Sequence, residues 1–146
     1  MNTSANPLIR SGAWLAINLL MLMVWGFAGI DKVRSGIPSW FDGKFGPTFL
    51  ARFPGLTMTF WLLTAAELAA FLLAAIALGR GEFIRRSTPI WLMSTLVWSL
   101  FVFLQLALGQ WLTADYNGTF QMFTYFGMTL LMLHFVMASS REAARD

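Results

Sequence analysis

The chain has 146 residues, of which 58% are hydrophobic and only 12% are charged, and its formal net charge is +3. A soluble domain carries about a quarter charged residues, so this composition indicates an integral membrane protein with a single domain. The absence of cysteine excludes disulfides, thiolate metal sites and iron–sulfur clusters on this chain. The basic surplus fits anionic lipid head groups and does not indicate a nucleic-acid partner.

Four apolar stretches are long enough to cross a lipid bilayer as helices, since about 20 residues are needed for a span. They lie at residues 14–30, 58–78, 90–109 and 120–138. No small-residue cleavage site follows the first stretch, so we expect it to be a membrane span and not a cleaved signal peptide. The sequence therefore predicts an all-α, integral membrane four-helix bundle as one domain over residues 1–146.

The segment 34–57, between the first two stretches, is rich in glycine, proline, aromatic and charged residues. It is too long for a tight turn and too aromatic for a disordered tether. We expect an ordered loop that lies along the outer membrane surface, with one short helix at about 41–52. Its rings at Trp40, Phe41 and Phe45 are candidates for docking a partner protein.

The orientation is predicted from the basic residues, which are more frequent in cytoplasmic loops. With four spans, both termini and the loop between the second and third spans share one side. That side carries six basic residues, which are Arg10, Arg80, Arg85, Arg86, Arg141 and Arg145. The other side carries four, which are Lys32, Arg34, Lys44 and Arg52. The bias predicts that both termini lie in the cytoplasm.

Glu67 lies near the middle of the second stretch, where a carboxylate must be protonated, paired or facing water inside the bundle. One interpretation is a protonated glutamic acid that hydrogen-bonds a neighbouring helix. The other is a proton-handling or ligand-binding group in a cavity. Lys32 follows Asp31 at the expected end of the first span, where it either reaches out to water or leans inward toward a carboxylate.

Further polar residues are expected at the level of Lys32, on the outer side of the bundle. They are Gln105, Gln110, Asp115, Asn117 and Gln121. Asn117 or Thr119 is expected to cap the fourth helix, because both residue types satisfy free amide groups at a helix start. The sequence predicts the mouth of a polar ligand pocket, formed by Asp31, Lys32, Gln105, Asp115, Asn117 and Gln121 with Glu67 beneath them.

The chain resembles the DoxX-like family of small four-helix membrane proteins over most of residues 14–138. The resemblance rests on "WGFAGIDKV", on the loop "SWFDGKFGPTFLARFPG", on "TAAELAAFLLAA" and on "ADYNGTFQMFTYF". Gly29, Lys32 and Glu67 match the family pattern position by position. The resemblance implies a place beside membrane redox systems. Its DoxD-type members are subunits of a thiosulfate:quinone oxidoreductase, and its MauE-type members assist maturation of a periplasmic amine dehydrogenase.

Two classes of function follow as hypotheses. In the first, the chain is an accessory subunit of a membrane redox complex and holds a quinone head or a lipid, with Lys32 and Glu67 as pocket groups. Electrons then come from another membrane or periplasmic redox subunit, since the single histidine, His134, excludes a haem held between two histidines. In the second, the polar residues only join helices, and the loop 34–57 docks a partner. A small transporter is a weaker third hypothesis, because the sequence shows no inverted repeat. No catalytic residue or metal site is predicted, and the isolated chain is not expected to be an enzyme.

Overall fold

The computed structural model describes residues 7–84 and 88–143, and this part of the chain is helical without any strand. Four long helices are α1 (Pro7–Ser35), α3 (Leu56–Gly79), α4 (Ile90–Leu112) and α5 (Tyr116–Ala143), with the short α2 (Trp40–Phe45) and the 3-10 turn η1 (Phe49–Ala51) between α1 and α3. All four long helices have the length and apolar composition to cross a membrane. The prediction of four such helices is confirmed.

The helices extend beyond the predicted apolar stretches, most clearly in α1, which was expected only at 14–30. Backbone hydrogen bonds continue a helix through polar residues, so an apolar stretch marks the part at membrane depth and not the helix ends. Pro7 suits a first helical turn. Gly36, with φ of +68°, follows the last turn, and its N–H donates to the Lys32 carbonyl at 2.9 Å. Lys32 thus lies in the last turn of α1, as the sequence predicts.

The loop between α1 and α3 contains two short helical segments instead of the single helix expected at 41–52. α2 ends where the Gly46 N–H donates to the Asp42 carbonyl at 2.8 Å. Thr48 then caps η1, because its hydroxyl accepts from the Leu50 N–H at 3.3 Å. Three of the arginines counted for the orientation, Arg85, Arg86 and Arg145, lie outside the described residues.

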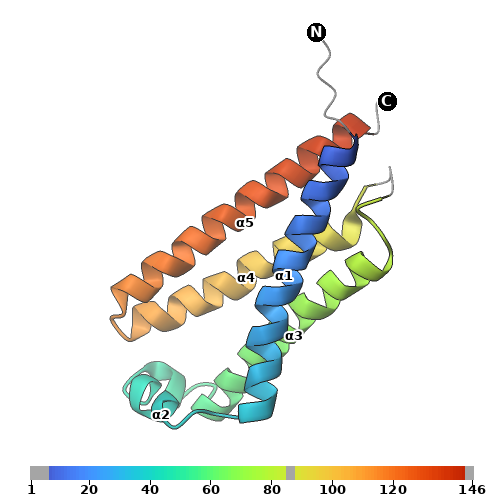
Figure 1. The fold of residues 1–146 in the computed structure, drawn as a ribbon. Coiled ribbons are helices and arrows are strands. Elements are labelled where there is room, and N and C mark those ends of the chain that lie inside the picture. The colour runs from blue at the N-terminus through green and yellow to red at the C-terminus, as the bar shows by residue number, and fades with distance from the viewer. Residues whose placement is uncertain (1–6, 85–87, 144–146) are drawn as a thin grey trace.

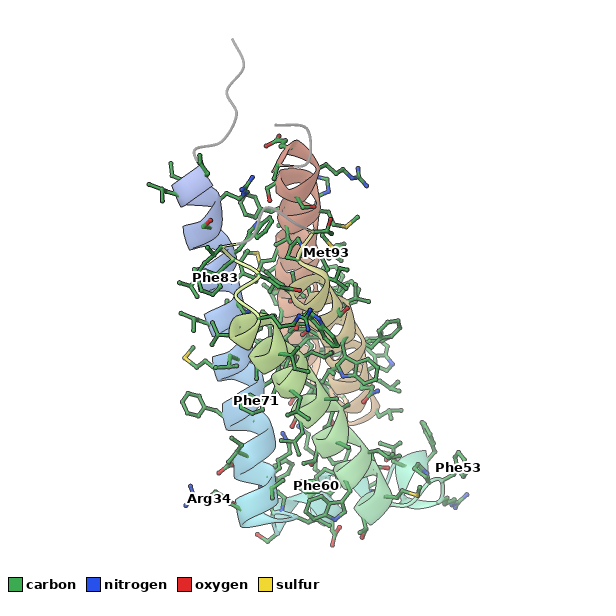
Figure 2. The ribbon with its side chains drawn as sticks, turned by 90° about the vertical axis from the view of Figure 1, so that its right-hand side faces the viewer. Arg34, Phe53, Phe60, Phe71, Phe83 and Met93 are labelled. Atoms are coloured by element: carbon green, nitrogen blue, oxygen red, sulfur yellow. The ribbon has the colours of Figure 1, made fainter. Side chains whose placement is uncertain are left out.

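The long helices pack in the order α1, α3, α4, α5, and α1 touches α5 only weakly. Figure 1 shows that the start of α1 meets the end of α5, and that the two helices diverge toward the other end, where α2 lies. At the meeting point the Trp14 N–H donates to Ser139 Oγ at 2.9 Å. We call the other end, where the helices diverge, the α2 end. Figure 2 shows Arg34, Phe53 and Phe60 at the α2 end, and Phe83 toward the opposite end, where α1 begins.

Small residues let α1 approach α3 closely. A Cβ on Gly29 would lie 2.8 Å from Cδ2 of Leu68, and one on Gly26 would lie 3.0 Å from the Phe71 ring. Lipid tails are as apolar as leucine, so helices in a membrane associate through such packing and through hydrogen bonds between helices. Trp25 supplies one of these bonds, donating from its buried indole N–H to Ser99 Oγ on α4 at 2.8 Å.

Glu82, which the sequence analysis did not single out, caps α4 from the loop before it. Its side chain is 7% exposed, and its carboxylate accepts from the Trp91 N–H at 3.0 Å and the Leu92 N–H at 2.9 Å. The N-cap residue itself, Pro89, offers no side-chain acceptor. A carboxylate is favourable here, because the first amides of a helix are free and carry partial positive charge. This contact fixes the loop between α3 and α4 onto the start of α4.

Candidate functional site

An ion pair joins α1 and α3 inside the bundle. Lys32 Nζ lies 2.8 Å from both carboxylate oxygens of Glu67. Glu67 is 1% exposed, whereas 26% of the Lys32 side chain remains accessible. Of the two orientations considered for Lys32, the structure thus shows the inward one. Glu67 is paired with Lys32 and shielded by the surrounding helices.

The close packing at Gly29 explains why the pair can form. Gly29 lies one turn before Lys32 and faces Leu68, the neighbour of Glu67. The helix axes are therefore close enough for the lysine stem to reach the carboxylate. A second polar link between α1 and α3 lies farther from the α2 end. There the Asn18 amide, oriented so that both polar atoms are satisfied, donates to Ala74 O at 2.9 Å and accepts from Leu78 N at 3.2 Å.

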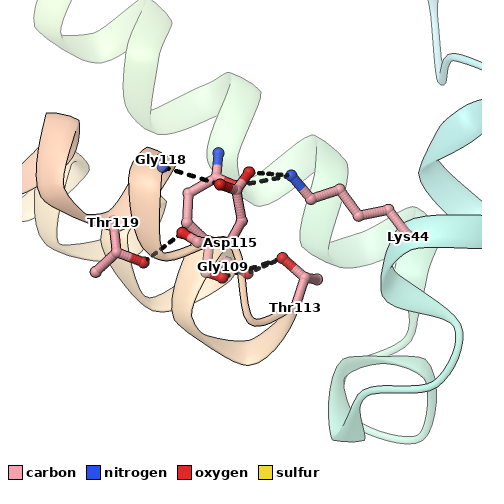
Figure 3. A network of polar contacts seen from close by, with 7 residues as sticks. Lys44, Gly109, Thr113, Asp115, Gly118 and Thr119 are labelled. Carbon is pink, nitrogen blue, oxygen red and sulfur yellow. Dashed lines mark hydrogen bonds and ion pairs between the residues drawn. The ribbon is translucent and has the colours of Figure 1, made fainter.

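A second charged cluster ties α2 to the turn between α4 and α5. Lys44 Nζ donates to Gln110 Oε1 at 2.7 Å and lies 3.1 Å from Asp115 Oδ2. Figure 3 shows Lys44 reaching from its helix toward Asp115, which also accepts from the Gly118 N–H. The Gly118 N–H lies 2.9 Å from Asp115 Oδ1. We call Lys44, Gln110, Asp115 and Gly118 the turn cluster.

Asp115 is the residue that caps α5, so the expectation of Asn117 or Thr119 is wrong. α5 begins at Tyr116, directly after Asp115, because the helix starts before the apolar stretch that suggested its position. Thr119 Oγ1 instead donates to the Asp115 carbonyl at 2.8 Å, and Asn117 is exposed. A Cβ on Gly118 would lie 3.0 Å from both Asp115 and Gln110, so glycine at 118 leaves room for the cluster.

The Gly118 N–H and the Lys44 ammonium lower the pKa of Asp115 below its ordinary value. The turn cluster should therefore contribute fully to stability above the ordinary aspartate pKa of about 4. That contribution should disappear as pH falls below this value and through the lowered pKa of Asp115. We expect Asp115→Asn to lower the unfolding midpoint at neutral pH, and the difference from wild type to vanish in acid.

The measurement is detergent-induced unfolding of wild type and variant as a function of pH. Asp42→Asn is the matched control, because Asp42 is an exposed carboxylate on α2 outside the turn cluster. A difference between Asp115→Asn and wild type that stays constant down to strong acid would contradict this assignment. A loss of the same size in Asp42→Asn would contradict it too.

A mostly apolar cavity of about 270 Å³ lies between α2, η1, the start of α3 and the end of α4. We call it the α2 groove. It is lined by Phe41, Phe45, Leu50, Pro54, Thr59, Leu62, Leu63, Gln105, Leu106, Leu108, Gly109 and Gln110. Leu62 and Leu108 are 53% and 50% exposed, so the groove opens sideways on the apolar face of the helices. Its size is close to the lower limit of ligand pockets, about 300 Å³.

The predicted polar pocket is divided between different places. Lys32 and Glu67 come together, but neither lines the α2 groove. Gln105 lines that groove, whereas Asn117 and Gln121 lie on the exposed surface of α5. Asp31 is also exposed, and its carboxylate accepts a long hydrogen bond of 3.4 Å from Ser35 Oγ.

The aromatic residues proposed for docking also differ in position. Trp40 is 59% exposed, but Phe41 is 6% exposed and packs inside the chain. Its ring centroid lies 4.7 Å from that of Phe45 and 5.4 Å from that of Phe60. The single histidine, His134, is exposed on α5. Phe41 and Phe45 thus form one wall of the α2 groove. This role could not be predicted from the sequence, because it depends on where α2 packs.

Comparison of the chain with family models, with curated proteins and with solved structures gives no match.

Proposed function

We propose that this chain is an accessory subunit of a membrane redox complex and holds a quinone- or lipid-like amphiphile in the α2 groove. We place it in the bacterial inner membrane with both termini in the cytoplasm, as the loop charges predict. Electrons come from a partner subunit. The α2 groove is the observation that carries the proposal, since it is a preformed apolar cavity with carboxamides on its wall.

The shape of the groove suits a molecule that enters from the bilayer. Its flank is formed by the half-exposed leucines Leu62 and Leu108, so an apolar tail can leave sideways into lipid. Its wall on the α2 side carries aromatic rings, and Gln105 and Gln110 supply the polar groups. A few convergent polar groups in an apolar cavity orient a ligand without binding most of its surface.

The two charged contacts support the groove without lining it. The Lys32–Glu67 pair holds α1 against α3, and the Lys44–Asp115 pair holds α2 against the turn after α4. Each wall of the groove is thus fixed to a neighbouring element. We assign Lys32 and Glu67 to this supporting role, and ligand contact to the groove residues.

The test is to fill the groove and measure what the protein retains. Leu108→Trp places a large ring on the flank of the groove, and Leu104→Trp places one on an equally exposed position of α4 outside it. Each protein is extracted from native membranes into nanodiscs, and the bound small molecules are identified by mass spectrometry. We expect wild type and Leu104→Trp to keep one amphiphile in fixed ratio, and Leu108→Trp to lose it. Equal retention by both variants would contradict the proposal.

A second candidate, an assembly subunit that docks a partner, is favoured by exposed aromatic rings at the α2 end. Trp40, Phe49 and Phe53 are 59%, 54% and 78% exposed. Tryptophan and phenylalanine are enriched in the cores of protein interfaces. On this hypothesis Trp40→Ala with Phe53→Ala should strip a redox subunit from the purified complex, while the amphiphile stays bound. Phe27→Ala, equally exposed at 73% on α1, is the control. Co-purification unchanged in the double variant would rule this candidate out.

A further inference from the structure

We propose that an anionic phospholipid binds at the end of the bundle opposite α2, with its phosphate at Arg141 and one acyl chain in a groove between α3 and α4. This site shares no lining residue with the α2 groove, so the inference is independent of the proposed function. Three features carry it: two adjoining cavities, the charge of their lining and the depth to which they extend.

The two cavities adjoin at Met93, near the start of α4. The first, of about 320 Å³, lies between the start of α4 and the end of α5 and is lined by Thr88, Met93, Met137, Ser140 and Arg141. The second, of about 400 Å³, lies between α3 and α4 and is lined by Leu73, Ile90, Met93, Ser94, Val97 and Trp98. We call them the Arg141 cavity and the Trp98 groove. Figure 2 shows Met93 toward the end where α1 begins. Because the flexible Met93 lines both cavities, one elongated molecule can occupy them together.

The Arg141 cavity suits a phosphate group. Arg141 is the one cation among the described residues that line the two cavities, and none of those residues is acidic. Within the described part of the chain, no carboxylate lies at ion-pair distance from Arg141. Its side chain is long and exposed, and a guanidinium donates paired hydrogen bonds to phosphate oxygens. Thr88 adds a hydroxyl to the lining, whereas Ser140 already donates to the Met137 carbonyl at 2.9 Å.

The surrounding charges favour a head group with net negative charge. Glu82 lines neither cavity, and its carboxylate accepts from the first N–H groups of α4. Glu142 follows Arg141 on α5 and projects about 100° away from it around the helix. The ammonium of a zwitterionic head would therefore find no acidic partner in the lining. Arg10 and Arg80, which lie over the rings of Trp14 and Trp91, add positive charge to this end of the bundle.

The Trp98 groove suits an acyl chain. Its α4 lining extends from Ile90 to Trp98, about 12 Å along the helix at 1.5 Å per residue. The lining is apolar except for Ser94 and the Trp98 indole N–H, which donates to the Ala66 carbonyl at 2.9 Å. Ile90 and Val97 are exposed, so the groove is open to the bilayer and a bound lipid can exchange with its neighbours. A free phosphate ion would fill only the Arg141 cavity.

The test compares two photoreactive lipids, phosphatidylglycerol and phosphatidylcholine with a diazirine on one acyl chain, each at low mole fraction in phosphatidylcholine nanodiscs that hold the full chain. A covalent probe is needed, because an exchanging lipid is not expected to stay bound when the protein leaves the membrane. After illumination, the labelled peptides are mapped by mass spectrometry. We expect the phosphatidylglycerol probe to label residues 90–98 about fivefold more than the phosphatidylcholine probe, as for attraction to one arginine. Unlabelled phosphatidylglycerol should suppress this excess, and inorganic phosphate should not.

Four variants locate the two parts of the site. Arg141→Gln should abolish the preference for phosphatidylglycerol, whereas Arg34→Gln, at an exposed arginine of the α2 end, should keep it. Val97→Trp fills the Trp98 groove and should reduce the labelling, whereas Leu104→Trp, at an exposed position of α4 outside both cavities, should not. All four positions are exposed, and an unchanged unfolding midpoint in sodium dodecyl sulfate checks that each variant is folded.

Three results would overturn the proposal. The first is equal labelling of wild type by the two probes, or a preference that survives in Arg141→Gln. The second is suppression by inorganic phosphate as strong as that by phosphatidylglycerol, which would assign a free anion to the Arg141 cavity. The third is labelling confined to Leu62 and Leu108, which would place the lipid in the α2 groove and leave the proposed function standing.

Discussion

Lys32→Met should lower the free energy of unfolding by about 3 kcal/mol or more, as expected when one partner of a buried ion pair is removed. The remaining Glu67 is 1% exposed and would lose the ammonium that lies 2.8 Å from both of its oxygens. Unfolding by sodium dodecyl sulfate in mixed micelles, followed by far-ultraviolet circular dichroism, measures the loss.

Replacing the other partner, Glu67, by glutamine should cost less free energy of unfolding. A difference between the two variants shows that the charges, and not only the packing of the side chains, stabilise the bundle. In Glu67→Gln the amide can still accept from Lys32, and the lysine, 26% accessible, can move its ammonium toward water. We expect a loss of about 1–2 kcal/mol. The double variant Lys32→Met with Glu67→Met should be more stable than Lys32→Met alone, because no unpaired charge remains. A double variant that is no more stable than Lys32→Met would contradict the ion-pair account.

Gly29→Leu should separate α1 from α3 and destabilise the bundle by about 1–3 kcal/mol, the usual cost of overpacking a filled interior. Even a Cβ at this position would lie 2.8 Å from Cδ2 of Leu68 and 3.4 Å from its backbone nitrogen. Because the lysine stem reaches Glu67 across this contact, the same change should lengthen the distance between Lys32 and Glu67. The mixed-micelle unfolding experiment measures the stability.

Gly12→Leu provides the matched control on the same helix. A Cβ on Gly12 meets nothing within 4 Å, so a larger side chain there should be tolerated. A stability loss in Gly12→Leu equal to that in Gly29→Leu would mean that the effect comes from losing a glycine in α1. The close approach of the two helices would then not be its cause.

The four long helices could be predicted from the sequence, because each contains a long apolar stretch that is separated from the next one. It was less informative about their ends, since polar residues such as Lys32 continue the backbone hydrogen bonds of a helix. Glu67 could be predicted to need a partner, because an unpaired carboxylate at membrane depth costs free energy. That Lys32 is this partner depends on the contact between Gly29 and Leu68, which no pattern within α1 reveals.

The groove was harder to predict, because its walls come from segments that are distant in sequence. Phe41 and Phe45 were assigned to an outer docking surface, since an aromatic loop indicates exposure until the packing of α2 is known. Gln105 was predicted to be a pocket residue because it is polar and lies at the depth of Lys32, and it does line the α2 groove. Asn117 and Gln121 share that level but lie on the exposed surface of α5, and the position of a residue around the bundle cannot be derived from its depth.

Occupancy of the α2 groove is the central claim, and native mass spectrometry of the intact protein released from native nanodiscs tests it most directly. The wild-type chain should carry one non-covalent adduct of constant mass, and that mass should match a quinone or a single lipid species. Protein released without an adduct, or with a broad mixture of bulk phospholipids, would contradict the claim.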